Sequence, residues 1–159
     1  METTGLDPER DAILEIGIVK IKMGTIIASE SFLIEQDNKI PENITRLTGI
    51  TDQEVMDMGI PLEEALHKLA FLIKGTIVYG YNVDFDCSFL RYAYDKHKLE
   101  FPIGRTKDVL RMARKKIDRI LDYKMATVAS YFSLEETVKH RALPDCQLTY
   151  RILMKLNEK

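Results

Sequence analysis

The sequence has few cysteines and no long apolar run. Cys87 and Cys146 are its only cysteines, they form no Cys-x-x-Cys pair, and reduced thiols are therefore the expectation. No apolar stretch approaches the length that spans a membrane, and the first residues lack the pattern of a signal peptide. These absences predict a cytoplasmic protein that does not associate with a membrane.

The chain also lacks an excess of charge of either sign. Its net charge of −2 gives no whole-chain argument for nucleic-acid binding. The distribution is uneven, because residues 105–124 hold eight basic and three acidic side chains, a net charge of +5, which leaves −7 for the rest. Such a segment is either a solvated helix face or a surface that follows phosphate groups.

The length of 159 residues predicts one domain, over residues 1–159. Residues 12–22 and 26–34 alternate as strands do, and the turn between them predicts an antiparallel hairpin. The unbroken apolar run 76–81 predicts a buried parallel strand, with Tyr79 in the core. Helices are predicted over 51–58, 61–73, 108–116, 125–132 and 144–156, and from about Asp86, with Tyr94 in the core. This order predicts a mixed sheet flanked by helices.

Two helix starts carry specific predictions. Thr51 and Glu54 have the spacing of a capping box, in which each side chain binds the other residue's backbone N–H. Asp84 and Asp86 compete for one functional position. Asp84 suits a helix N-cap, and Asp86 is taken as the functional carboxylate.

Three carboxylates and one histidine form the candidate site. His140 precedes Asp145 by five residues, and Pro144 between them suits the first turn of a helix, where the positive end of the helix dipole favours a carboxylate. Together with Glu2 and Asp86, these residues come from three distant segments. Carboxylates gathered in one cleft repel each other unless a cation such as Mg²⁺ or Mn²⁺ lies among them. Each residue taken singly is more often structural.

Five stretches carry a resemblance to a known family. They are Glu2–Pro8 with Ile13–Val19, Thr48–Thr51, Asn82–Leu90, Thr106–Arg114 and His140–Asp145. In this order they resemble the motifs of the DEDD 3′→5′ exonuclease superfamily, in its histidine-bearing DEDDh branch. That branch includes proofreading subunits and domains of bacterial replicative DNA polymerases.

The resemblance implies a ribonuclease-H-like fold, a five-stranded mixed sheet with helices on both sides. It implies that Glu2, Asp86 and Asp145 hold two Mg²⁺ or Mn²⁺ ions and that His140 is the general base. The implied reaction releases nucleoside 5′-monophosphates from a DNA 3′ end, with RNA as a further possible substrate and a DNA polymerase subunit or domain as a partner. The implied contacts to the terminal nucleotide are Thr3, Thr4, Gly5, Asn82 and Phe85; a turn and a core ring are the structural readings of the last two.

The sequence departs from the family pattern at its first motif. That motif is Asp-x-Glu at the end of a strand, whereas here Met1 and Glu2 are present and the aspartate and most of the strand are absent. Three interpretations are open: a fragment or misassigned start, a strand-swapped dimer, or a non-catalytic relative that serves as a binding module. For this chain we therefore expect lower stability than is usual for the family and strongly impaired catalysis.

Overall fold

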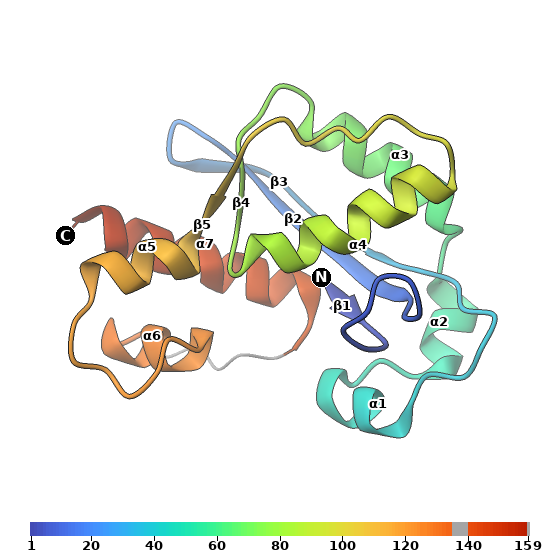
Figure 1. The fold of residues 1–159 in the computed structure, drawn as a ribbon, viewed down its shortest axis with the longest axis horizontal. Coiled ribbons are helices and arrows are strands. Elements are labelled where there is room, and N and C mark those ends of the chain that lie inside the picture. Colours follow the sequence, from blue (N-terminus) through green and yellow to red (C-terminus); the bar gives the residue numbers. More distant parts are fainter. Residues whose placement is uncertain (135–139, 159) are drawn as a thin grey trace.

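The computed structural model describes residues 1–134 and 140–158, and it has strands at its centre with helices around them (Figure 1). The strands are β1 (Glu2–Thr3), β2 (Ile13–Lys22), β3 (Thr25–Leu33), β4 (Val78–Gly80) and β5 (Thr106–Asp108). The helices are α1 (Glu42–Thr48), α2 (Asp52–Met58), α3 (Leu62–Ile73), α4 (Val83–Lys96), α5 (Val109–Lys116), α6 (Met125–Tyr131) and α7 (Ala142–Glu158). None of the helices in these described ranges is both long and apolar enough to cross a membrane.

The predicted hairpin is confirmed. β2 and β3 pair antiparallel, from Glu15 opposite Leu33 to Lys22 opposite Thr25. Met23 and Gly24 form the turn with φ of 51° and 78°, the left-handed geometry that joins twisted strands tightly. β1 lies antiparallel on the other edge of β2 and places Glu2 opposite Glu15.

The five strands form two hydrogen-bonded sheets rather than one. β1–β2–β3 is antiparallel, and β4 pairs in parallel with β5. β1 has two residues and pairs with β2, so no ladder joins it to β4 within the described part of the chain. The prediction that Tyr79 is buried is wrong: it is 39% exposed, because this short strand turns that side chain outward, beside Lys107.

Three apolar clusters hold the helices in place, and the smallest of them joins Leu14 of β2 to Val55 of α2. α3 and α4 pack on the hairpin through a stripe that was predicted for α3, and Tyr94 of α4 is buried there with its hydroxyl donating to the Leu66 carbonyl at 2.6 Å. α5, α6 and α7 share a second cluster around Val109, Val128 and Ile152. The last helix thus lies between this cluster and β2, which brings its first turn to the centre of the molecule (Figure 1).

Two predictions about helix starts are corrected. α4 begins at Val83, earlier than the predicted Asp86, and Asn82 precedes it with φ of 64°. Asp84 is therefore inside the first turn rather than at the N-cap, and it pairs with Arg111. The Thr51 hydroxyl does accept from the Glu54 N–H at 3.1 Å, but the Glu54 carboxylate is paired with Arg141, so the capping box is half formed.

Candidate active site

The predicted carboxylates belong to the starts of three elements, Glu2 to β1, Asp86 to α4 and Asp145 to α7; Figure 1 shows how β1, α4 and α7 are arranged. The nitrogen of Met1, next to Glu2, lies 3.4 Å from Oδ1 of Asp86. Asp145 is in the first turn of α7, close enough for its charge to act on Glu2. The structure thus brings Glu2, Asp86 and Asp145 into one neighbourhood, although they are far apart in sequence.

Burial and charge repulsion raise the pKa values of two carboxylates in this neighbourhood. Burial raises the pKa of Glu2 to about 7; the Met1 amino group opposes the shift, and the charges of Asp145, Glu15 and Asp86 add to it. Burial also raises the pKa of Asp86, against the effect of the Met1 amino group. Buried carboxylates that repel one another in this way are stabilised when a cation binds among them.

His140 lies two residues before α7, on the loop predicted for it. Its φ of 49° is in the left-handed region, and its side chain is exposed. The imidazole is therefore accessible to water and to a substrate, as a general base requires.

The loop that follows β1 uses its side chains to fold itself. The Thr3 hydroxyl donates to the Gly5 carbonyl at 2.6 Å, and the Thr4 hydroxyl accepts from the Ala12 N–H at 2.8 Å. A Cβ at Gly5 would lie 2.3 Å from the Asp11 carboxylate, so a larger residue there would require the Asp11 side chain to move. The observed role of Thr3, Thr4 and Gly5 is therefore structural: they fix the backbone conformation of the loop next to Glu2.

The other two predicted substrate residues precede Asp86: Asn82 is the N-cap of α4, and Phe85 is in its first turn. Asn82 is exposed, and its backbone N–H donates to Oδ1 of Asp108 at 3.1 Å. The Phe85 ring is partly buried and packs on Phe89, with the ring centroids 5.1 Å apart. The structural roles expected as alternatives are thus both observed: Asn82 is in a turn, and the Phe85 ring packs on the core.

Asp108 is a supporting residue that the sequence did not single out. Besides Asn82, its carboxylate accepts from the Leu110 N–H at 2.8 Å and so caps α5. One aspartate thus joins the start of α5 to the start of α4, which carries Asp86. The signal available in the sequence was the position of an aspartate directly before a helix.

Glu15 and Arg141 were also missed. Glu15 is 3% exposed, and its Oε2 accepts from the Ala142 N–H at 2.7 Å and from Nε of Arg141 at 3.1 Å. Its Oε1 accepts from Nη2 of Arg141 at 3.1 Å and from the Ser31 hydroxyl at 2.8 Å. Burial works to raise the pKa of Glu15, but the bonds from Arg141 and Ala142 outweigh it and hold this pKa below its usual value.

The carboxylates of Glu2, Asp86 and Asp145 are the groups that could hold a metal. Within residues 1–134 and 140–158, no three histidine, cysteine or carboxylate side chains are already arranged around one point as metal ligands. The donor set nevertheless fits a hard divalent ion, because it is all oxygen and because burial, together with the charges of Asp145, Glu15 and Asp86, raises the pKa of Glu2, a strain that a bound cation would relieve. Ligation requires these side chains to converge further.

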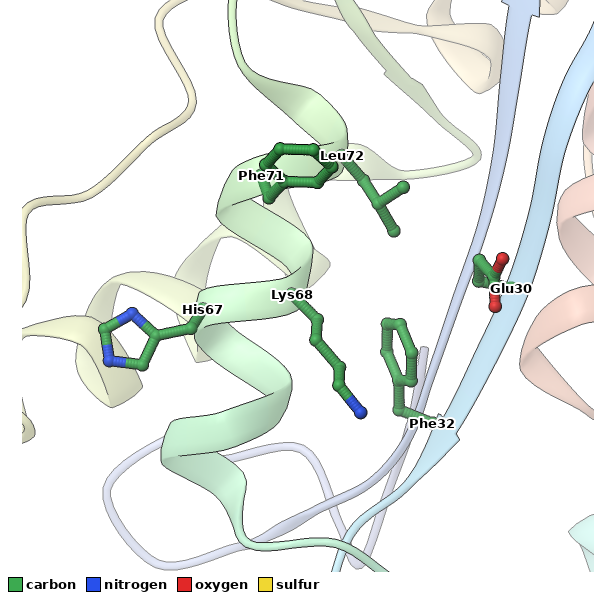
Figure 2. A pocket seen from close by; sticks show the side chains of 6 residues that line it. All are labelled: Glu30, Phe32, His67, Lys68, Phe71 and Leu72. Atoms are coloured by element: carbon green, nitrogen blue, oxygen red, sulfur yellow. The ribbon is translucent and has the colours of Figure 1, made fainter.

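A groove of ≈ 470 Å³ between α3 and β3 is separate from this site. Figure 2 shows Lys68, Leu72 and Phe32 lying toward one another, with Phe71 at the rim and His67 directed away from β3. Lys68 Nζ lies 5.6 Å from the centroid of the Phe32 ring. None of the predicted site residues lines this groove.

The fold and the site define a nuclease class, and the comparisons with known proteins agree. The family model RNase_T, described as exonuclease, matches residues 1–153, and the chain belongs to this family. The predicted resemblance to the DEDDh exonucleases is therefore confirmed, and membership in an exonuclease family does not favour the binding-module alternative.

The curated relatives include replicative polymerases. The chain is 34% identical over 160 residues to DNA polymerase III PolC-type of Caldanaerobacter subterraneus subsp. tengcongensis, a match over 100% of this chain and 11% of that protein. It is 31% identical over 159 residues to DNA polymerase III subunit epsilon of Aquifex aeolicus, over 99% of this chain and 78% of the relative. The chain thus spans about a tenth of the PolC-type proteins and most of the epsilon subunit.

Solved structures confirm the ribonuclease-H-like α/β fold. Exonuclease X in complex with 5′ overhanging duplex DNA superposes with a TM-score of 0.75 at 24% identity, over 99% of this chain and 87% of that one. Exonuclease I of E. coli in complex with a dT13 oligonucleotide gives 0.82 at 20% identity, over 98% of this chain and 39% of that one. A zinc-bound form of the E. coli exonuclease I–single-stranded DNA complex shares the fold, with a TM-score of 0.82, at 20% identity, over 98% of this chain and 38% of that one.

Proposed function

We propose that this domain is a proofreading-type 3′→5′ exonuclease that removes nucleotides from a DNA end. The observation that supports the proposal is the mutual proximity of Glu2, Asp86 and Asp145, together with an exposed His140 two residues before the helix that carries Asp145. Membership in the exonuclease family supports it, as does the match to an epsilon subunit over most of that subunit's length.

The chain's residues divide the work of one hydrolysis. Glu2, Asp86 and Asp145 would hold two Mg²⁺ or Mn²⁺ ions, which would supply charge stabilisation at the phosphate and lower the pKa of the attacking water. His140 takes a proton from that water as it attacks the terminal phosphorus. The bond to the 3′ oxygen of the preceding nucleotide breaks, so the products are a nucleoside 5′-monophosphate and a strand with a new 3′ hydroxyl.

The rest of the strand leaves the site over the basic segment 105–124. The loop of Thr3, Thr4 and Gly5 faces the terminal nucleotide on one side, with Asn82 and Phe85 on the other. Arg111 of the basic segment is already paired with Asp84 beside Asp86, so this segment begins at the site. Lys115 and Arg119, further along the segment, are exposed, so their charged groups are available to bind the phosphates of the strand.

The partners follow from the same assignment. The substrate is a DNA 3′ end, with RNA as the substrate to compare, and the domain works in the cytoplasm as a polymerase subunit or as a domain of one. β1 is a sheet edge in the described structure, so a second copy could add a strand there and form a strand-swapped dimer. Light scattering at several concentrations separates a monomer from such a dimer.

Product analysis tests the proposal. The chain is incubated with single-stranded and 3′-recessed DNA, and with RNA of the same sequence, in Mg²⁺ or Mn²⁺. We expect nucleoside 5′-monophosphates from DNA, and about 10²-fold less or none from an Asp145→Asn variant, which keeps the shape of the side chain and loses its charge. No mononucleotides from either nucleic acid in either metal would reject the proposal and favour a binding module.

A further inference from the structure

Glu15 connects the two halves of the site. Its backbone pairs with Glu2 across β1 and β2, and its side chain reaches the start of α7, 127 residues further along the chain. A single residue of the central strand therefore contacts one proposed metal ligand through the ladder and the helix of another through its carboxylate.

Arg141, which binds the Glu15 carboxylate, lies between His140 and Asp145 in the sequence. It directly follows His140, and its carbonyl accepts the N–H of Asp145 at 3.1 Å. Its guanidinium makes two parallel bonds to Glu15, a geometry that fixes direction as well as distance. Through these bonds Glu15 ties the backbone between His140 and Asp145 to β2.

The packing around the pair leaves little freedom. A Cβ on Gly17 would lie 2.4 Å from the Ala142 carbonyl carbon, so α7 touches the backbone of β2 directly. The Cys146 thiol donates to the Gly17 carbonyl at 3.2 Å. Arg141 also lies 3.1 Å from Glu54, which adds α2 to the same junction.

We infer that Glu15 and Arg141 are positioning residues: their bidentate pair fixes the first turn of α7 on β2 and thereby sets where His140 and Asp145 stand relative to Glu2. The inference rests on the proposed function for its catalytic readout. It assigns no contact with substrate to either residue. Supporting residues around a metal site are commonly worth a factor of 10 to 100 in affinity or rate.

The experiment compares variants by hydrolysis rate and by binding of Mn²⁺ alone, the latter by titration calorimetry. Arg141→Gln should lower kcat about 10- to 100-fold with KM changed less than about threefold, and should weaken Mn²⁺ binding about tenfold or more. Arg141→Lys keeps the charge but not the paired geometry, so it should recover part of both losses. Combining Glu15→Gln with Arg141→Gln should be no worse than either alone, because both remove one interaction.

A matched control separates positioning from a general loss of structure. Lys155→Gln removes an exposed ion pair at the far end of α7, and it should stay within about twofold of the parent. Folding of every variant is checked by urea denaturation, and if Glu15→Gln does not fold, the Arg141 variants decide the matter.

The outcomes are distinct for the two proposals. A folded Arg141→Gln variant with unchanged kcat and Mn²⁺ affinity would overturn the inference, and so would a rise in KM alone, which would assign Arg141 to substrate binding. If the parent chain releases no mononucleotides, the proposed function fails, while Mn²⁺ binding still decides between positioning and no role.

Discussion

Replacing Gly17 by alanine should displace the first turn of α7. The added Cβ would lie 2.4 Å from the carbonyl carbon of Ala142 and 2.6 Å from the nitrogen of Leu143, both backbone atoms that no rotamer change can move. Either β2 or α7 must therefore shift by several tenths of an ångström or more. A shift of either element changes the position of Asp145 on α7 relative to Glu2, which pairs with β2.

The expected magnitudes follow from overpacking. Forcing extra atoms into a close contact costs about 1–3 kcal/mol, which for a domain of this length lowers Tm by roughly 2–12 °C. Misplacing a reactive group by about 1 Å can lower a rate about 10²-fold. We therefore expect Gly17→Ala to lose activity more severely than stability, with both measured on the same preparation by thermal unfolding and by mononucleotide release.

Gly104 supplies the matched control, because a Cβ there would meet no atom within 4 Å. Gly104→Ala should keep parental activity and stability, or gain up to about 1 kcal/mol through a less flexible unfolded chain. If Gly17→Ala were as stable and as active as Gly104→Ala, the claim that α7 is held directly on the backbone of β2 would be refuted.

Three further predictions concern charge. Glu2, with its pKa raised from 4.5 to about 7, binds a proton more tightly in the folded state, so the metal-free protein should lose up to about 3 kcal/mol of unfolding free energy between pH 4.5 and 7, and Glu2→Gln should remove this slope in urea titrations. Changing Lys115 and Arg119 to Glu should weaken DNA binding about tenfold or more at low salt and flatten its salt dependence, measured by fluorescence anisotropy, whereas Lys98→Glu outside the segment should not. Asp108→Ala should cost about 1–2 kcal/mol in urea denaturation through the lost cap of α5, and an unchanged midpoint would contradict that role.

Local patterns sufficed for much of the fold. The alternating residues on both sides of Met23 and Gly24 predicted the hairpin, and the apolar stripe of α3 predicted its buried face. Pro144 was correctly placed in the first turn of the last helix, which begins at Ala142. These features depend on neighbours in sequence, which is why the sequence alone revealed them.

The errors arise from contacts between distant segments. Glu54 has the spacing of a capping-box residue, but its carboxylate is drawn to Arg141, a cation with a second partner in Glu15. Asp84 suits an N-cap, yet Arg111 from another helix holds it. No local spacing indicates a partner 27 residues away or, for Glu15 and Arg141, 126 residues away.

The candidate site also has residues that the sequence identified and residues that only the structure identified. The motif resemblance identified the carboxylates of Glu2, Asp86 and Asp145, and the fold places them together. Glu15 and Asp108 lie within stretches that carry the resemblance, but their supporting contacts became apparent only from the hydrogen bonds of the folded chain.

The polarity of digestion tests the central claim most directly. A single-stranded DNA oligonucleotide labelled at its 5′ end is incubated with the chain and Mn²⁺, and the labelled products are separated by length over time. The account predicts a ladder of labelled strands that shorten one nucleotide at a time from the 3′ end, absent with Asp145→Asn. Immediate release of labelled mononucleotide, or internal cuts of fixed length, would contradict a 3′→5′ exonuclease.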